Sequence, residues 1–365
     1  MQKLFLLGIV LLGVGFIYIK HHDAQVLKNT PADSTEMVEE TQREKSNSEE
    51  SIIPVQSQTE TVFVPYWNMF NTSELSSYDS VIYFGISATK DGINKEDQGF
   101  ANISKFVQST DNSQTYLTLR MLNAESNLEI LENTQAQQKI IDETINLAND
   151  NGFDGIVLDL ELSVIPFTNV KDNISLFVTS FSKELRNQNL AFLITLYGDT
   201  YYRSRPYDVK VIGKEADEVL IMAYDFHKSR GEPGPNFPFE GQHEYGYDFQ
   251  QMVHDFSQDV PVEKLTVIFG MYGYNWTLGS EDKPLKAATA VTLASAEEAF
   301  IDSCNYTNCT SARDKDSAEM KVTYADDEHY KHVVWFEDES SVETKSEYLK
   351  KQGIGKIGYW TWGYW

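Results

Sequence analysis

The sequence predicts a (β/α)8 barrel with a small α+β insertion between its seventh and eighth strands. Two observations lead to this fold class. Eight apolar, strand-like runs follow one another from residue 62 onward, and most are separated by a segment compatible with a helix. Such alternation is typical of parallel strands joined by crossover helices. Eight units in about 300 residues also fit the usual size of this barrel.

The expected strands are short runs rich in Val, Ile, Leu and aromatic residues. Helical spacing marks the segments around the fourth run. Before it, Ile141, Ile145 and Ala148 share one helical face, and after it apolar residues recur every three or four positions from 174 to 185. The eight runs are residues 62–67, 81–87, 116–122, 155–162, 191–198, 218–226, 265–274 and 355–363.

A doubly wound open sheet is the competing topology for this alternation. That fold usually carries a glycine-rich nucleotide-binding turn after its first strand. The first run continues as "VFVPYWNMF", residues 62–70, and has no such turn. The barrel is therefore the preferred prediction.

Two segments interrupt the alternation. Residues 227–247 are rich in Gly and Pro and predict a long loop after the sixth strand, on the active-site face of a barrel. Residues 277–334 predict an inserted subdomain, with "MKVTYADD" as one of its strands. Cys304 and Cys309 lie in this insertion and are expected to form a local disulfide. A metal clip is the alternative, but no other Cys and no close His completes one.

The chain is expected to begin with an export segment. Residues 1–22 hold an apolar run after Lys3 and predict a signal anchor or a signal peptide; the absence of a small-x-small cleavage site favours the anchor. Residues 23–60 are polar and acidic and predict a disordered linker, followed by the barrel domain at 61–365. The expected location is extracellular, tethered to the cell surface by the N-terminal segment or secreted if it is cleaved.

Net charge and aromatic content limit the partners. A net charge of -25 argues against nucleic acid, because phosphate backbones are bound by Lys and Arg. Aromatic residues make up 13% of the chain, and flat aromatic rings also serve as platforms for the apolar faces of sugars.

The run "DGIVLDLEL", residues 154–162, places two acids on one face of a strand. Side chains alternate along a strand, so Ile156, Leu158 and Leu160 face one way while Asp159 and Glu161 face the other. In a barrel the acidic face would point inward, at the carboxyl end where catalytic groups lie. A carboxyl group kept protonated by a neighbouring acid can serve as a proton donor. The alternative is a half-exposed strand with one wetted face.

Four stretches in order resemble motifs of the family 18 glycoside hydrolases, the chitinase family. "FDGIVLDLE" at 153–161 is similar to the fourth-strand signature DGxDxDxE, and "MAYDF" at 222–226 to the sixth-strand Met-x-Tyr-Asp motif. "GMYGYNW" at 270–276 and "YWTWG" at 359–363 resemble the seventh and eighth strands. The resemblance covers residues 62–363 and is strongest to the bacterial branch with spore-cortex and cell-wall glucosaminidases.

The resemblance implies catalytic roles for four residues. Glu161 matches the general acid that protonates the glycosidic oxygen, and Asp159 matches the acid that orients the N-acetyl group of the substrate. The acetamide oxygen of the substrate is then the nucleophile, which is the substrate-assisted exception among glycosidases. Tyr224 and Asp225 match the pair that holds the acetamido group.

It also implies substrate-binding residues. Trp360 matches the aromatic floor of the sugar pocket, Met222 a pocket wall, and Tyr66 and Trp276 further lining positions. For Trp276 the alternative is a core aromatic. Trp362 lies two residues beyond Trp360 and is expected on the same face, so it competes for the role of floor.

One position departs from the family motif. Val157 stands where the family usually has a third Asp. The loss of a neighbouring carboxylate should make Asp159 easier to ionise. We therefore expect slower turnover or a shifted pH optimum.

The expected function is hydrolysis of β-linked N-acetylglucosamine polymers: chitin, peptidoglycan or an N-glycan core. No metal or organic cofactor is implied, and a monomer is expected. A sugar-binding protein that has lost turnover is the alternative, which Val157 favours and the retained Glu161 disfavours. A structural surface protein gives no reason for Glu161, Tyr224 and Asp225 to occur together.

Overall fold

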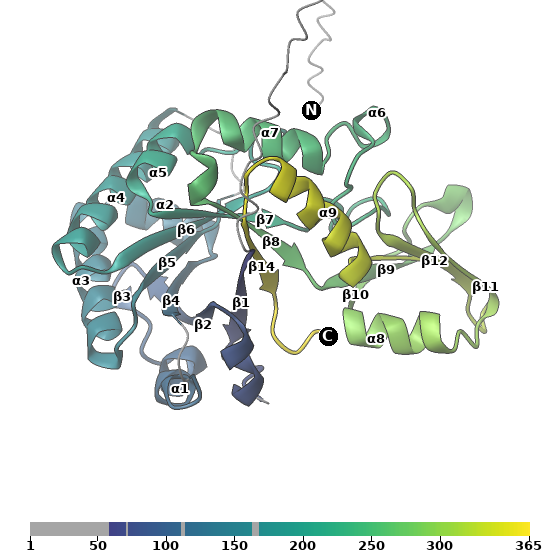
Figure 1. Ribbon diagram of the computed structural model, residues 1–365, viewed down its shortest axis with the longest axis horizontal. Coiled ribbons are helices and arrows are strands. Elements are labelled where there is room, and N and C mark those ends of the chain that lie inside the picture. The colour runs from purple at the N-terminus through teal and green to yellow at the C-terminus, as the bar shows by residue number, and fades with distance from the viewer. Residues whose placement is uncertain (1–57, 71, 111–113, 163–167) are drawn as a thin grey trace, which may run out of the picture. The chain divides into compact units, whose positions relative to one another are not determined.

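A closed parallel barrel forms the body of the protein, as predicted (Figure 1). The computed structural model describes residues 58–70, 72–110, 114–162 and 168–365. Within them, eight parallel strands form the ring, which closes because β1 pairs with both β14 and β2. In order around the ring, they are β1 (Thr59–Pro65), β2 (Ser80–Thr89), β4 (Gln114–Met121), β5 (Gly155–Leu160), β6 (Ala191–Tyr197), β7 (Glu218–Ala223), β8 (Leu265–Gly270) and β14 (Lys356–Trp360).

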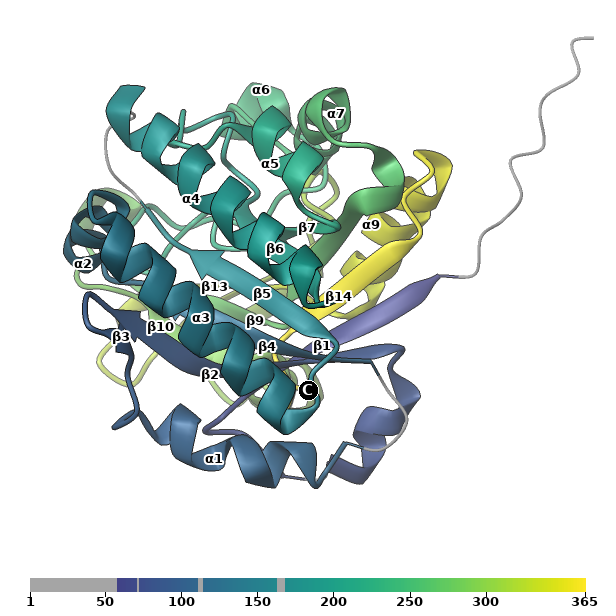
Figure 2. The same cartoon turned by 90° about the vertical axis from the view of Figure 1, so that its left-hand side faces the viewer.

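Helices follow most of the strands and cover the outside of the barrel. Figure 2 shows α3 and α4 lying over the outer face near β5 and β6. The helices are α1 (Gln98–Val107), α2 (Ala124–Leu131), α3 (Thr134–Asn151), α4 (Thr168–Asn187), α5 (Val209–Glu215), α6 (Gln242–Tyr245), α7 (Phe249–Asp259), α8 (Leu293–Ala296) and α9 (Glu339–Lys351). The two-residue strand β3 (Gly92–Ile93) pairs antiparallel with the end of β2.

Local signals fix the start of β5, the strand that carries the acidic face. Helix α3 begins at Asn133, whose side chain accepts hydrogen bonds from the N–H groups of residues 135 and 136, and ends at Gly152 with a left-handed φ of 73°. Asp154 then accepts a hydrogen bond of 2.7 Å from the backbone N–H of Thr115 in β4. These contacts set the register of β5 against β4.

The side-chain alternation of β5 is confirmed. Ile156 and Leu158 are buried in the layer between barrel and helices, together with Phe177 and Phe181 of α4. Val157 points the other way, into the barrel interior. That interior core consists of Phe63, Ile82, Phe84, Val157, Leu193, Leu220 and Ile268.

The insertion between the last two barrel strands is a five-stranded antiparallel sheet with α8 beside it. The predicted seventh strand divides in two: β8 ends at Gly270, and after Met271 the chain enters the inserted sheet as β9. The sheet therefore starts and ends outside the interval 277–334. Its strands, in spatial order, are β10 (Thr289–Thr292), β9 (Tyr272–Leu278), β13 (Lys331–Phe336), β12 (Met320–Ala325) and β11 (Thr307–Arg313).

Cys304 and Cys309 form a disulfide within this insertion, with their Cα atoms 6.2 Å apart. The predicted export segment at 1–22 and nearly all of the acidic linker at 23–60 lie outside the described residues. Among the residues that the structure describes, no helix is long and apolar enough to span a membrane.

Candidate active site

A cavity of about 290 Å³ lies at the carboxyl end of the barrel strands. Carboxylates, aromatic rings and one guanidinium meet there. These groups lie on six barrel strands or just after them, and one lies at the start of the inserted sheet. This is the end of the barrel at which the sequence predicted a site. The cavity is lined by Phe63, Trp67, Phe84, Arg120, Leu122, Asp159, Glu161, Thr195, Met222, Tyr224, Asp225, Tyr272 and Trp360.

Asp159 lies deepest among the acids and is only 3% exposed. Its carboxylate accepts a hydrogen bond of 2.5 Å from the Thr195 hydroxyl. Burial, and secondarily the charge of Glu161, raise the pKa of Asp159 to about 7, while Thr195 and the Arg120 charge act in the opposite direction. The side chain can therefore hold or release a proton near neutral pH.

Glu161 follows directly after β5 and is half-buried. Its backbone continues the strand pairing for one more residue, because its N–H donates to the carbonyl of Met121 at 2.9 Å. The Tyr197 phenol donates a hydrogen bond of 2.5 Å to one carboxylate oxygen of Glu161. The guanidinium of Arg205 lies 3.6 Å from the centre of the Tyr197 ring. Glu161 is thus held at the cavity edge by a phenol that is itself packed against a cation.

Tyr224 and Asp225 both reach the cavity because β7 ends at Ala223. Asp225 has a left-handed φ of 59°, so the alternation of the strand no longer applies. Its N–H donates to the side-chain oxygen of Asn236 at 2.8 Å. Its carboxylate accepts hydrogen bonds from the phenols of Tyr272 and Tyr274, the second at 2.7 Å.

Burial raises the pKa of both Tyr224 and Tyr272 well above the ordinary value for tyrosine. Both phenols therefore stay protonated over the whole neutral range. Each can donate one hydrogen bond into or beside the cavity.

Trp360, the last residue of β14, lines the cavity with its aromatic ring. Its ring lies 6.4 Å from that of Tyr224 with 23° between the planes, and the edges of Phe63 and Phe84 support it. Trp362 is not part of the cavity. Its indole N–H donates to the carbonyl of Phe70 at 2.7 Å, and the expectation that it shares the face of Trp360 is wrong because the strand ends at Trp360.

Two predicted binding residues lie elsewhere. Tyr66 does not line the cavity, because β1 ends at Pro65. Trp67, two residues after that end, lines the cavity instead. Trp276 is fully buried in the inserted sheet, against Val333 and Trp335, which matches the alternative of a core aromatic. Met222, by contrast, lines the cavity.

Sequence reasoning missed Arg120, Thr195 and Tyr197. A signal for two of them was present: Leu193 faces the barrel interior, so Thr195 and Tyr197 fall on the same inward face of β6. Arg120 is the register partner of Asp159 on the neighbouring strand β4. A lone Arg in an apolar run gave no sign of this pairing.

The described ranges bring His243, Glu244 and Asp316 close enough to share a metal ion, with ligand atoms within 4.8 Å of one another. His243 and Glu244 are exposed, and none of the three lines the cavity.

The carboxylates and the tryptophan at the carboxyl mouth of this barrel are the kinds of group that a glycoside hydrolase uses: acids beside the scissile bond and an aromatic face for a sugar ring. The sequence as a whole agrees with this site. Residues 38–364 match the family model "Glycosyl hydrolases family 18", and the chain belongs to this family of glycosidases.

Bacterial enzymes named for lysis of the spore cortex are among the proteins that this chain resembles, and the chain spans less than two thirds of the length of the first curated relatives. The chain is 26% identical over 300 residues to the cortical fragment-lytic enzyme of Bacillus anthracis; the match covers 77% of this chain and 64% of that protein. The spore cortex-lytic enzyme SleL of Bacillus cereus has the same fold, with a TM-score of 0.68 at 22% identity over 84% of this chain and 71% of that one. A family 18 N-acetylglucosaminidase of Paenibacillus barengoltzii gives a TM-score of 0.71 at 15% identity, over 84% and 96%.

Proposed function

We propose that the chain is a retaining glycosidase that cleaves β-linked N-acetylglucosamine polymers, with Glu161 as the general acid. The proposal rests on one observation: acidic and aromatic side chains from different barrel strands line one cavity. Asp159 and Glu161 come from β5 and the residue just after it, Tyr224 and Asp225 follow β7, and Trp360 ends β14 across the ring. All five line the same cavity. A sugar ring on Trp360 would have both acids on its edge.

The chemistry follows from these positions. Glu161 gives its proton to the glycosidic oxygen. At the same time the acetamide oxygen of the substrate bonds to the anomeric carbon, and the bond between that carbon and the glycosidic oxygen breaks. Asp159 orients the acetamide, and its pKa of about 7 allows it to share a proton with that group. Tyr224 and Asp225 hold the acetamido group from the other side. Water then attacks the anomeric carbon, the bond from that carbon to the acetamide oxygen breaks, and the proton lost by the water returns Glu161 to its protonated form.

Bacterial peptidoglycan is the substrate that the comparisons favour. The relative and the structural neighbour named above are called cortical fragment-lytic and spore cortex-lytic enzymes. Chitin and N-glycan cores carry the same sugar and are the competing substrates. Comparing the products released from purified peptidoglycan, chitin and a glycoprotein would separate the three.

The test of catalysis is hydrolysis of a fluorogenic chitobiose or chitotriose by the wild-type chain and by Glu161→Gln. We expect the variant to lose at least about a hundredfold in kcat, as general acids contribute. Equal rates for the two proteins would end the proposal of an enzyme. Binding of the sugar without cleavage by the wild-type chain would instead favour the sugar-binding alternative.

We also propose that the protein acts outside the cell, tethered by its first residues. The support is the apolar run that follows Lys3 and the disulfide between Cys304 and Cys309. Fractionation of expressing cells tests this: recovery of the chain in the membrane fraction, with the barrel accessible to external protease, is expected. Recovery in the cytosol would contradict it.

A further inference from the structure

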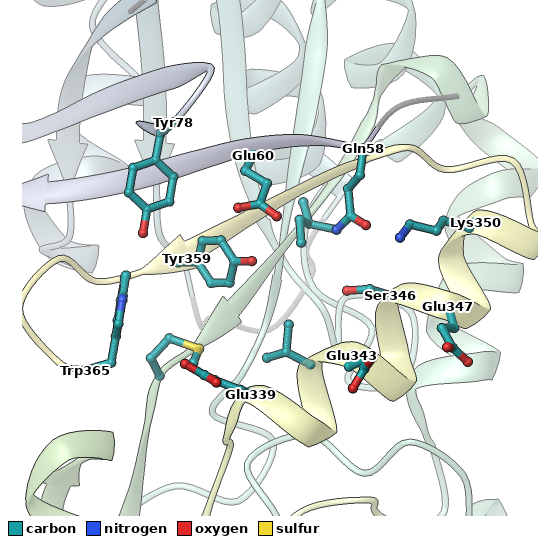
Figure 3. A pocket seen from close by; sticks show the side chains of 13 residues that line it. Gln58, Glu60, Tyr78, Glu339, Glu343, Ser346, Glu347, Lys350, Tyr359 and Trp365 are labelled. Atoms are coloured by element: carbon teal, nitrogen blue, oxygen red, sulfur yellow. The ribbon is translucent and has the colours of Figure 1, made fainter. Parts of the chain in front are cut away.

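A groove of about 440 Å³ lies on the outer wall of the barrel, beside α9 and the strands β1 and β14 (Figure 3). It shares no lining residue with the catalytic cavity. Its floor includes Ile357 and Tyr359, which alternate with the inward-facing Trp360. The groove therefore lies on the face of β14 opposite to the barrel interior.

The groove lies between α9 and the barrel wall. The α9 side is lined by Glu339, Glu343 and Glu347, and the barrel side by Glu60 of β1 and by Ile357 and Tyr359 of β14.

The groove carries an excess of negative charge. Glu60 of β1 faces a row of glutamates from α9, and Lys350 is the one cationic residue among the lining residues (Figure 3). The glutamates of α9 are exposed at positions 339, 343 and 347. This arrangement is complementary to a cationic ligand.

Aromatic rings line one end of the groove. The ring of Tyr359 lies 6.1 Å from that of Tyr78 and 5.6 Å from that of Trp365, measured between ring centres. Trp365 is 38% exposed, so its indole is available to a ligand. An ammonium group bound near aromatic faces and carboxylates is stabilised by both.

A buried hydroxyl points to a missing polar partner. Ser346 of α9 is 5% exposed and lines the groove, yet its Oγ has no hydrogen-bond partner among the residues that the structure describes (Figure 3). Buried hydroxyls are rarely left unpaired, because the lost hydration is not replaced. A donor from a ligand in the groove would satisfy this oxygen.

We propose that this groove is a docking site for a lysine-bearing segment of a partner polypeptide. The ammonium of lysine offers three donors and no acceptor, which suits Ser346 Oγ and the surrounding carboxylates. The carbon stem of the side chain packs on Trp365. The chain's own residues 23–57 are a poor occupant, because they hold eight acidic and three basic side chains and so repel the groove.

The experiment measures binding of a fluorescein-labelled hexalysine peptide to the full chain by anisotropy at physiological salt. The test variant is Glu343→Gln with Glu347→Gln. The matched control is Glu125→Gln with Glu129→Gln, another pair of exposed glutamates four residues apart on a helix. We expect the groove variant to bind at least about tenfold more weakly, since it removes two of the contacting charges. The control should change by less than about twofold.

Trp365→Ala separates a shaped site from general attraction to an acidic chain. We expect it to weaken hexalysine binding about fivefold without changing the net charge. Equal losses in the two glutamate double variants, or no binding by the wild-type chain, would overturn the proposal. A wild-type dimer that the groove variant converts to a monomer would show that a second copy occupies the groove, which also overturns it. Sugar hydrolysis should be unchanged in all of these variants.

Discussion

Tyr197, the last residue of β6, donates a hydrogen bond of 2.5 Å to the carboxylate of Glu161, just beyond the neighbouring strand β5. Two cations lie against the same phenol ring: Arg205 at 3.6 Å and Lys228 at 5.3 Å from its centre. A nearby positive charge strengthens a phenol as a hydrogen-bond donor. The orientation of the proposed general acid therefore depends on a residue that does not itself line the cavity.

Tyr197→Phe should lower kcat about tenfold, because loss of one hydrogen bond to a charged group removes about 1.4 kcal/mol of positioning. KM should stay within about twofold, since Tyr197 is not among the lining residues. Steady-state kinetics with fluorogenic chitobiose measures both. Tyr330→Phe, at an exposed ring in the connection between β12 and β13, is the control and should leave kcat unchanged. An unchanged kcat in Tyr197→Phe would refute the positioning role.

The buried acid makes stability depend on pH. Burial raises the pKa of Asp159 from 3.8 to about 7, so the folded chain keeps a proton there that the unfolded chain releases above about pH 4. The contribution of Asp159 to stability therefore falls as the pH rises from about 4 to about 7 and is constant above that range. Asp159→Asn removes this loss, and its Tm relative to wild type should rise over the same interval and then level off.

Thermal melts at several pH values measure this difference. Asp150→Asn, at an exposed position near the end of α3, is the control and should show a constant difference in Tm. Parallel curves for Asp159→Asn and the wild-type chain would contradict the assignment of a raised pKa to Asp159.

The missing acid of the family motif can be restored. Val157 is fully buried in the barrel interior, and its register partner on β4 is Thr118. Within the described part of the chain, the buried Oγ of Thr118 has no hydrogen-bond partner. Val157→Asp would give this hydroxyl an acceptor. It would also place a second carboxyl group on the same face as Asp159, and we expect the pKa of Asp159 to rise further.

The pH–rate profile checks this expectation. The limb that reports ionisation of Asp159 should move to higher pH by at least about half a unit in Val157→Asp, the direction set by an added like charge. Val157→Asn offers the same hydrogen bond without a charge and should leave the limb in place. Coincident profiles for the wild-type chain and Val157→Asp would show that the substitution in this sequence has no electrostatic effect.

Strand periodicity predicted the parts of the site that lie within strands. It placed Asp159 on the inward face of β5 and gave the order of all eight barrel strands. It failed for three residues that lie beyond the end of a barrel strand, where the alternation stops. Tyr66 follows the end of β1, Trp362 follows the end of β14, and Trp276 lies beyond the end of β8.

Contacts between separate segments left no local pattern to read. Asn236 lies in the loop after β7, and its amide donates to the carbonyls of Gly270 and Tyr272 while its oxygen accepts the N–H of Asp225. The loop was predicted from its Gly and Pro content, but composition does not show which carbonyls a loop residue will meet. This loop is also held by a buried ion cluster of Lys345, Glu319 and Glu337, which likewise left no local pattern in the sequence.

That cluster joins α9 to the site. Lys345 is fully buried and donates hydrogen bonds to Glu319 at 3.0 Å and to Glu337 at 2.5 Å. Glu319 in turn accepts the backbone N–H groups of Asn236 and Phe237 at 2.6 and 2.7 Å. The conformation of Asp225 thus depends, through Asn236, on a carboxylate whose charge is balanced by one lysine.

Lys345→Met should destabilise the fold by about 3–5 kcal/mol, because it leaves two carboxyl groups buried without their cation. Burial raises the pKa of Glu337 to about 8, and Lys345 opposes that rise. In the variant the pKa of Glu337 rises further. The fall in stability with rising pH therefore extends to a higher pH than in the wild-type chain, and the destabilisation should be larger at pH 8 than at pH 5. Denaturant unfolding at the two pH values measures it.

Lys356→Met is the matched control: its pair with Glu218, at 2.6 Å, is partly exposed and should contribute less than about 1 kcal/mol. Equal losses in the two variants would mean that burial of the Lys345 cluster does not decide its contribution.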